Sequence, residues 1–230
     1  MSNVGFRIYK KINRPSRELV EIFKGLPVAN IADEMNRLNC VDARIKPLND
    51  KPLLGTAFTV KARVGDNLMF HKALDLAEPG DIIVVDGRGD LANSLTGEIM
   101  MRQALKKGLA GIVVDGAVRD SDALRKLNLA IYAAGITPQG PYKNGPGEIN
   151  VPVCCGGVTV NPGDIIVGDG DGIVVISPKD AALVAEKARV KSQKEEATFK
   201  AIADGTLDRS MYSDDAFIKK GCDIIDDFYK

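Results

Sequence analysis

The chain has 230 residues, of which 45% are hydrophobic and 27% charged, and this composition predicts one large globular domain with a full core. Lysine plus arginine and aspartate plus glutamate both number 31, so the formal charge is zero and a strongly basic nucleic-acid-binding protein is excluded. No apolar run is long enough to span a membrane and the first residues lack a signal-peptide pattern, so we expect a cytoplasmic protein without membrane contact.

Several residue types that enzymes often use are scarce. His71 is the single histidine, which excludes a zinc site made of several histidines within one chain. The four cysteines form no C-x-x-C pair, and we expect all of them to be buried reduced thiols: Cys40, Cys154, Cys155 and Cys222. Carboxylates, arginine, lysine and backbone amides remain for chemistry, and they suit a hard cation such as Mg²⁺.

The first eighty residues predict three helices and a strand. Ser16 can cap a helix that runs to Phe23, and residues 31–38 predict a second helix. A strand over 56–62 precedes a helix over 67–77, which ends at Pro79-Gly80 because neither residue continues a helix well.

Residues 81–134 alternate between strands and helices. The continuous apolar runs over 81–86, 111–115 and 130–134 predict strands that are buried on both faces. A glycine-rich turn after the first of them leads to a helix that ends near Gly108, and a short helix covers about 120–127. This order predicts parallel strands joined by right-handed crossovers.

Beyond the glycine-rich stretch 140–147 the predicted elements become short. Strands are expected over 157–160, 164–167 and 172–176, with tight turns at 161–163 and 169–172. Two helices follow, a long one rich in lysine and glutamate over 181–203 and a last one over 214–229. The chain is therefore predicted to be a mixed α/β sandwich with helical ends and no linker between domains.

Two turns between a strand and a helix carry the strongest candidate site. In the first turn, Thr96 can cap the following helix, and Gly97 at the first helical position leaves backbone N–H groups open to a carboxylate or phosphate. The alternative is a capped helix whose glycine only allows tight packing.

The second turn, over 115–120, supplies Arg119 and Asp120. The arginine can bind carboxylate and carbonyl oxygens through two N–H groups, and the aspartate can hold a divalent cation beside it. Alternatively, Asp120 caps the next helix and Arg119 neutralises it. Because neighbouring parallel strands end at the same sheet edge, we expect both turns to meet there and form a site for a 2-oxo acid.

Other residues have competing interpretations. Residues 87–92 fit the pattern G-x-G-x-x-A, but eighty residues precede them and no second nucleotide-binding half follows, so a dinucleotide site is disfavoured. Lys61 could form a Schiff base, although a surface lysine is the simpler interpretation. His71 is expected to be packed or exposed rather than catalytic, and Asp33 and Glu34 are expected to be surface carboxylates.

The combined spacing of four segments resembles the RraA-like family. These segments are 65–67 (Gly-Asp-Asn), 79–87 (Pro-Gly-Asp-Ile-Ile-Val-Val-Asp-Gly), 97–98 (Gly-Glu) and 115–120 (Asp-Gly-Ala-Val-Arg-Asp), and the resemblance extends from about residue 27 to 177. The family contains metal-dependent 4-hydroxy-4-methyl-2-oxoglutarate aldolases that also decarboxylate oxaloacetate. It also contains the regulator of ribonuclease activity A, which is a binding protein.

The resemblance implies a layered β/β/α fold with helical ends. It implies a single domain over 1–230, with a core over about 27–177 and a C-terminal helical extension over about 180–230. Asp120 would bind the metal, Mg²⁺ or Mn²⁺, and Arg119 the substrate, whose carboxylate would lie on the backbone amides of Gly97, Glu98, Ile99 and Met100. An acid from the neighbouring subunit of a homotrimer, or of a hexamer, matches Asp33 or, in a shifted register, Glu34.

We therefore predict a divalent-metal-dependent lyase that forms pyruvate from a 4-hydroxy-2-oxo acid or from oxaloacetate. Asp120 would hold the metal, Glu98 and Asp33 would act in its outer shell, and Arg119 would stabilise the developing pyruvate enolate. The sequence does not identify the base that removes the 4-hydroxyl proton, for which water held by the acidic shell is one candidate. A regulatory protein that binds an RNA-processing enzyme is the alternative.

Overall fold

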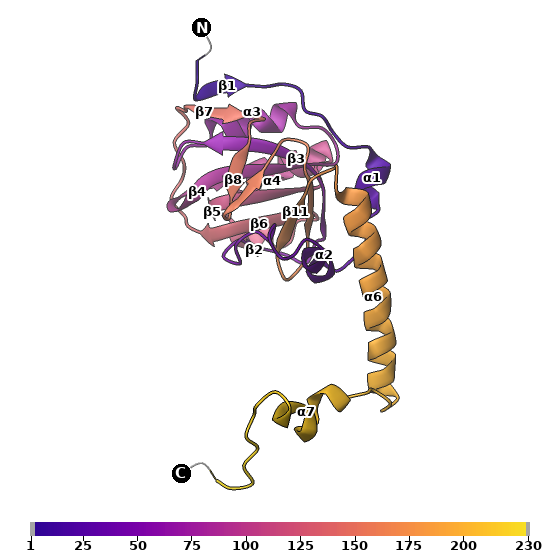
Figure 1. Ribbon diagram of the computed structural model, residues 1–230. Coiled ribbons are helices and arrows are strands. Elements are labelled where there is room, and N and C mark those ends of the chain that lie inside the picture. Colours follow the sequence, from indigo (N-terminus) through magenta and orange to yellow (C-terminus); the bar gives the residue numbers. More distant parts are fainter. Residues whose placement is uncertain (1–2, 229–230) are drawn as a thin grey trace. The chain divides into compact units, whose positions relative to one another are not determined.

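The computed structural model describes residues 3–228 and contains two compact units, Met1–Arg189 and Val190–Lys230 (Figure 1). Among the described residues, nine strands form the main sheet of the first unit. Seven of them follow the order β1-β7-β3-β4-β5-β6-β2, and β10 and β11 extend from β3. Their bounds are β1 (Phe6–Ile8), β2 (Lys46–Pro47), β3 (Leu53–Ala62), β4 (Asp81–Thr96), β5 (Gly111–Val118), β6 (Ala130–Ile136), β7 (Gly147–Ile149), β10 (Ile165–Gly168) and β11 (Ile173–Ile176).

The centre of the sheet consists of the four parallel strands β3, β4, β5 and β6. Their apolar runs are buried along most of their length, because other layers cover both faces of this part of the sheet. The prediction of buried parallel strands over 81–86, 111–115 and 130–134 is confirmed.

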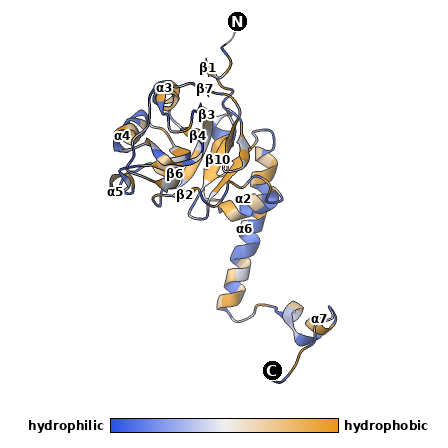
Figure 2. Ribbon diagram, turned by 90° about the vertical axis from the view of Figure 1, so that its left-hand side faces the viewer, coloured by the Kyte–Doolittle hydropathy of each residue, from blue (hydrophilic) through white to orange (hydrophobic). Residues whose placement is uncertain are grey.

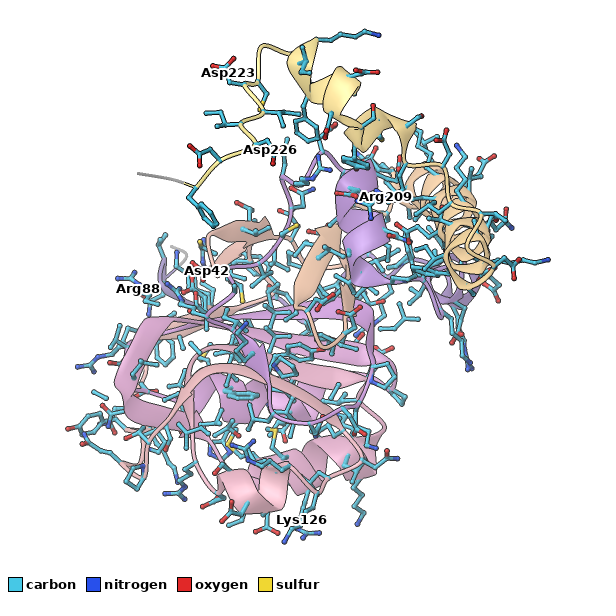
Figure 3. All side chains as sticks on the ribbon, turned by 90° about the horizontal axis from the view of Figure 1, so that it is seen from below. Asp42, Arg88, Lys126, Arg209, Asp223 and Asp226 are labelled. Atoms are coloured by element: carbon cyan, nitrogen blue, oxygen red, sulfur yellow. The ribbon has the colours of Figure 1, made fainter. Side chains whose placement is uncertain are left out.

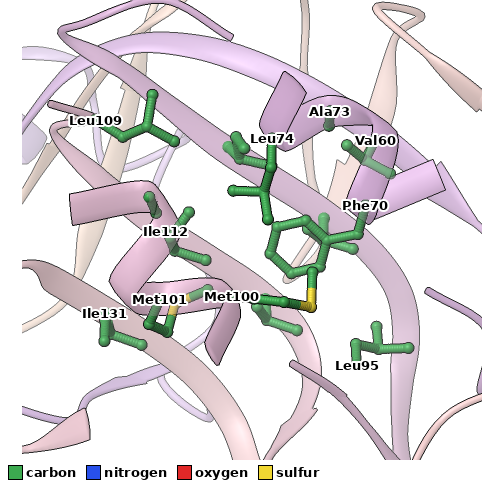
Figure 4. Packing of buried hydrophobic residues seen from close by; sticks show 14 of the residues in the cluster. Val60, Phe70, Ala73, Leu74, Leu95, Met100, Met101, Leu109, Ile112 and Ile131 are labelled. Carbon is green, nitrogen blue, oxygen red and sulfur yellow. The ribbon is translucent and has the colours of Figure 1, made fainter. Parts of the chain in front are cut away.

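Helices cover one face of this sheet and a small second sheet covers the other. Figure 2 shows α3 (Leu68–Leu76), α4 (Glu98–Lys107) and α5 (Ser121–Leu124) along one side of the strands. Phe70 and Leu74 of α3 and Met100 and Met101 of α4 point into the same apolar layer (Figure 4). On the opposite face, β8 (Val153–Cys155) and β9 (Val158–Val160) pack on alternate residues of the central strands. The predicted layered α/β sandwich is confirmed.

A third apolar cluster lies under the helical ends of the first unit. It joins α1 (Arg17–Glu21), α2 (Val28–Glu34) and the start of α6 (Ala181–Ala203) to β10 and β11. Ser16 caps α1 as predicted, because its hydroxyl accepts the N–H of Leu19 at 3.2 Å. These contacts bury residues such as Phe23, Ile31 and Val184.

The second unit has almost no interior. It contains the end of α6, a 3₁₀ turn over Ser210–Tyr212 and α7 (Asp214–Ile218), and none of its described residues is buried. Large apolar side chains such as Phe199, Met211, Ile225 and Phe228 are exposed. Within residues 3–228, none of the helices is both long enough and apolar enough to cross a membrane.

Several predicted boundaries are wrong. The helix expected over 31–38 begins at Val28 and ends at Glu34, because Asn36 and Arg37 adopt the left-handed conformation. The helix expected over about 120–127 covers only Ser121–Leu124, and the one expected over 214–229 covers only Asp214–Ile218 in its described part. The glycine-rich turn after residue 86 is instead a continuation of β4, whose pairing with β5 shifts register three times before Thr96.

The cysteine prediction is also wrong for three of the four residues. Cys155 is buried, and burial raises the pKa of its thiol, whereas Cys40, Cys154 and Cys222 are exposed. In β8 the side chains alternate between the two faces of the strand, so Val153 and Cys155 face the core while Cys154 faces outward.

Candidate active site at the ends of strands 4 and 5

The two turns meet at one edge of the sheet, as the sequence predicts. β4 ends at Thr96 and β5 ends at Val118, and these two residues are register partners. The N–H of Arg119 donates to the carbonyl oxygen of Thr96 at 2.9 Å, which fixes the second turn beside the first. The start of α4 and the Arg119-Asp120 pair are therefore neighbours.

The cap of α4 differs from the prediction. The N-cap residue is Gly97 rather than Thr96, and it has no side chain to satisfy the first amides. Instead, Oδ2 of Asp120 accepts the N–H of Glu98 at 2.9 Å, from 22 residues further along the chain. A Cβ atom at position 97 would collide with this carboxylate and would lie 2.9 Å from Cγ of Arg119. Gly97 therefore allows the carboxylate to reach the helix.

Asp120 does not use its side chain to cap its own helix, which was the simpler alternative for this residue. It lies in the left-handed conformation at φ 57°, and its backbone oxygen, not its carboxylate, accepts the N–H groups of Ala123 and Leu124. Nε of Arg119 lies 3.7 Å from Oδ2 of Asp120, and both side chains are more than 40% exposed. Since its contacts involve Oδ2, the Oδ1 atom is left for another ligand.

A pocket of about 150 Å³ lies over these residues. Its wall combines polar and apolar side chains, with one turn of α4 at its side: Asn67, His71, Thr96, Gly97, Ile99, Met100, Arg119, Asp120, Pro141 and Lys143. The buried atoms Oδ1 of Asn67 and Oγ1 of Thr96 have no hydrogen-bond partner among the described residues. The polar and charged side chains in the lining of this pocket suit a small polar ligand.

The structure adds three residues that the sequence did not assign to the site, Asn67, His71 and Lys143. Asn67 and His71 are one helical turn apart at the start of α3, and this spacing in the sequence could have predicted that both side chains lie on the same side of the helix. The pKa of His71 is lowered by burial and by the neighbouring charge of Lys143, against a smaller opposite effect of Asp75. The imidazole is therefore neutral at pH 7.

Two of the predicted acids do not line the pocket in this chain. Oε1 of Glu98 accepts N–H groups of Arg102 at 2.6–2.7 Å, which holds the side chain along α4. Asp33 lies on α2, where its carboxylate pairs with Arg37 at 2.8 Å, and Glu34 follows it. The structure thus brings together Gly97, Ile99, Met100, Arg119 and Asp120, but not Asp33.

The G-x-G-x-x-A segment does not form a nucleotide-binding turn. Residues 87–92 belong to β4, and the next helix begins only at Glu98. Asp115, which would bind a ribose in that interpretation, is buried and accepts hydrogen bonds from Arg44 and from the N–H of Gly156, both at 2.8 Å. Its role here is structural.

The donor atoms fit a partly hydrated hard cation. No group of three or more His, Cys, Asp or Glu side chains that could hold a metal ion occurs in residues 3–228. Asp120 is the single carboxylate in the lining of the pocket within that range. Mg²⁺ commonly binds proteins through one or two carboxylates and keeps several waters, so one exposed carboxylate in a polar pocket is compatible with it.

Comparisons with known proteins agree with this architecture. A protein of Halalkalibacterium halodurans, named provisionally as 4-hydroxy-4-methyl-2-oxoglutarate aldolase, is 41% identical over 191 residues, which are 83% of this chain and 91% of the relative. A structure from Pseudomonas syringae pv. tomato, of an uncharacterized protein, is 27% identical with a TM-score of 0.76, covering 85% of this chain and 97% of that one.

A third similar protein is Streptomyces coelicolor RraAS2, described as an unusual member of the RNase ES inhibitor RraA protein family. It is 30% identical with a TM-score of 0.72, over 81% of this chain and 98% of its own. The model of the RraA-like family, described as Aldolase/RraA, matches residues 28–175. The chain therefore belongs to the RraA-like family.

Proposed function

We propose that the chain is a lyase that uses a divalent cation to form pyruvate from 4-hydroxy-4-methyl-2-oxoglutarate, a related 4-hydroxy-2-oxo acid, or oxaloacetate. The observation that carries the proposal is the convergence of Arg119, the Asp120 carboxylate and the first turn of α4 on one small polar pocket. The similarity to a relative named for this aldolase reaction supports the reaction class.

The residues of the pocket match the charges of a 2-oxo acid. A Mg²⁺ or Mn²⁺ ion at Asp120 would supply Lewis-acid stabilisation of the charge that develops on the 2-oxo oxygen. Arg119 donates N–H groups to that oxygen, and its planar guanidinium holds it in a fixed direction. The N–H groups of Ile99 and Met100 have no partner within the helix, because they belong to its first turn, and they bind the 1-carboxylate.

His71 and Lys143 act on the other end of the substrate. His71 lines the pocket in its neutral form and accepts the proton of the 4-hydroxyl group as the C3–C4 bond breaks. Decarboxylation needs no such base, because loss of CO₂ leaves the same enolate. Both 4-hydroxy-4-methyl-2-oxoglutarate and oxaloacetate carry a second carboxylate, and the ammonium group of Lys143 is the partner we propose for it.

The site is proposed to be complete only in a ring-shaped homotrimer or a hexamer. Within one chain, the carboxylate of Asp33 on α2 forms an ion pair with Arg37, and Asp33 does not line the pocket. In the oligomer, Asp33 of one subunit would face Arg119 and Asp120 of its neighbour and hold water in the outer shell of the cation.

A panel of 2-oxo acids with Mg²⁺ or Mn²⁺, assayed for pyruvate with and without EDTA, tests the proposal. We expect metal-dependent pyruvate formation that EDTA abolishes, and we expect Asp120→Asn to remove it, since the amide keeps the shape of the side chain but not its charge. The exposed Lys126→Ala serves as a matched control and should behave as wild type. Absence of pyruvate from every acid in the panel would refute the lyase.

A regulatory binding protein is the second candidate, because a neighbour at 30% identity is described as an RNase ES inhibitor family member. Inhibition of a purified endoribonuclease, measured with wild type and Asp120→Ala, separates the two functions. A regulator inhibits equally with or without the Asp120 carboxylate, whereas a lyase loses pyruvate formation.

A further inference from the structure

A second hollow lies beyond two loops that border the candidate active site. Residues 63–67 and 141–147 each contribute to both spaces, and Asp66 joins the two loops. Oδ2 of Asp66 accepts the N–H groups of Asn144 at 2.6 Å and Gly145 at 2.9 Å, and its Oδ1 accepts that of Leu68. The hollow has a volume of about 640 Å³, more than four times that of the candidate active site, and shares no lining residue with it.

Cations dominate the lining of this hollow. Lys61, Arg63 and Arg88 line it, and Glu148 is the single carboxylate among its lining residues in the described chain. Oε1 of Glu148 is already paired with Nε of Arg7 at 2.6 Å, so it does not neutralise the three cations. We name this space, lined by Lys61, Arg63 and Arg88, the anion hollow.

The three cations lack charged partners of their own. Within residues 3–228, no carboxylate oxygen lies within 4 Å of the side-chain nitrogens of Lys61, Arg63 or Arg88. Arg63 donates one N–H to the carbonyl oxygen of Gly145 at 3.1 Å, which orients the guanidinium without neutralising it. Because the chain as a whole has equal numbers of acids and bases, this local excess of positive charge is a specific feature.

Arg88 of β4 lines the hollow from a strained backbone conformation. Lys61 of β3 is the register partner of Asp86 of β4, so Arg88 follows two residues after that pair. Arg88 adopts the left-handed conformation at φ 57°, which glycine tolerates better than arginine. The side chain of Arg88 therefore lines the same hollow as that of Lys61.

An adjoining hollow of about 450 Å³ adds a hydrogen-bond acceptor. It shares Lys61 and Glu148 with the anion hollow and is also lined by Asn150. The Nδ2 group of Asn150 donates to the carbonyl oxygen of Tyr9 at 2.7 Å, which fixes the amide orientation, and the buried Oδ1 has no partner in the described chain. One acceptor is therefore left unsatisfied in a residue that lines this hollow.

We propose that the anion hollow binds a small organic anion with at least two negative charges, either a polycarboxylate or a phosphate ester, at a site separate from the candidate active site. Three unpaired cations suit two or more charges, and the two hollows together exceed the size of a 2-oxo acid such as pyruvate. The inference does not depend on the lyase activity.

Calorimetric titration of the full chain with citrate and with pyrophosphate tests the inference and distinguishes carboxylate from phosphate recognition. We expect one site per chain for at least one probe, and an affinity that falls as NaCl is raised. Arg88→Ala and Lys61→Gln should each weaken binding about tenfold or more, since each removes a charge-assisted contact. Arg88→Lys should retain part of the affinity.

Matched controls locate the binding. Lys126→Ala removes a cation far from Arg88 on the first unit (Figure 3) and should bind as wild type. Arg119→Lys should also bind as wild type, because that residue belongs to the other pocket. Circular dichroism confirms that each variant is folded. The inference is overturned if wild type binds neither probe at millimolar concentration, if Arg88→Ala and Lys61→Gln bind as wild type, or if Arg119→Lys is weakened as much as they are.

Discussion

Replacing Gly97 by alanine perturbs the centre of the candidate active site by one methyl group. The added carbon would overlap Oδ2 of Asp120 and lie 2.9 Å from Cγ and 3.2 Å from Nε of Arg119. The backbone at Gly97 is extended, so alanine itself is not strained there. The two side chains must therefore move, and both can do so because they are half-exposed.

The cost to stability should be small and the cost to activity large. Moving Asp120 breaks its charge-assisted hydrogen bond to the N–H of Glu98, which contributes about 1.5 kcal/mol at a partly exposed position. Alanine in place of glycine also stabilises the folded state by about 0.4–1 kcal/mol, because it lowers the conformational entropy of the unfolded chain. The net loss of about 0.5–1 kcal/mol lowers Tm by roughly 1–4 °C. Under the proposed function, displacing one transition-state donor lowers kcat by about a hundredfold or more.

Thermal unfolding and pyruvate formation are measured on the same preparations of wild type and Gly97→Ala. Gly170→Ala is the matched control, since a Cβ there meets nothing within 4 Å and the backbone is not left-handed. We expect the control to retain full activity. If a folded Gly97→Ala protein turned over at a near-normal rate, the positions that Arg119 and Asp120 take beside Gly97 would be irrelevant to the chemistry.

Three further predictions concern the arginine, the histidine and assembly. Arg119→Lys keeps the positive charge but removes the planar guanidinium that can donate two N–H groups, so kcat should fall about a hundredfold with the fold intact. Near-normal turnover would exclude the proposed role of Arg119. The pKa of His71 is lower in the folded protein than in the unfolded chain, so the unfolded chain protonates this histidine first as the pH falls below about 6.5. The free energy of unfolding should therefore decrease on acidification below that pH. Urea unfolding at pH 7 and pH 5 should therefore show a larger acid-side loss for wild type than for His71→Gln, and equal losses would contradict this. If neighbouring subunits share sites, mixing inactive Asp33→Ala and Asp120→Ala chains should restore some activity. A site within one chain would be indicated by no recovery despite subunit exchange, or by light scattering that shows a fully active monomer.

Much of the central sheet follows from simple patterns in the sequence. The runs over 82–85, 112–114 and 130–134, in β4, β5 and β6, are apolar without interruption, as is typical of strands that are buried on both faces of a parallel sheet. The meeting of the two turns follows from the same fact, because parallel neighbours end at one edge. Arg119, Asp120 and Gly97 were therefore accessible from the sequence.

The remaining parts depend on contacts between distant segments. Lys143 reaches the pocket on a loop whose position is set by hydrogen bonds to Asp66, which lies 78 residues before Asn144 of that loop. In β4, both Arg88 and Gly89 adopt the left-handed conformation. Glycine commonly adopts it, but an arginine in the sequence does not predict it. Asp120 was expected to cap its own helix or hold a metal, and its contact with Glu98 arises only when the two turns come together.

That contact has a kinetic consequence for the proposed reaction. The Asp120 carboxylate lies on the N–H of Glu98, next to the N–H groups of Ile99 and Met100 that are proposed to bind the carboxylate of a 2-oxo acid, so the two negative charges would repel each other. Under the proposed function, a cation held by Asp120 would neutralise this carboxylate and reduce the repulsion. If the proposed function is correct, we therefore expect ordered addition, with the cation before the acid, and initial-rate data should show an acid that binds poorly to cation-free protein. Free carboxylates that arrive before the cation would therefore be excluded from the proposed site.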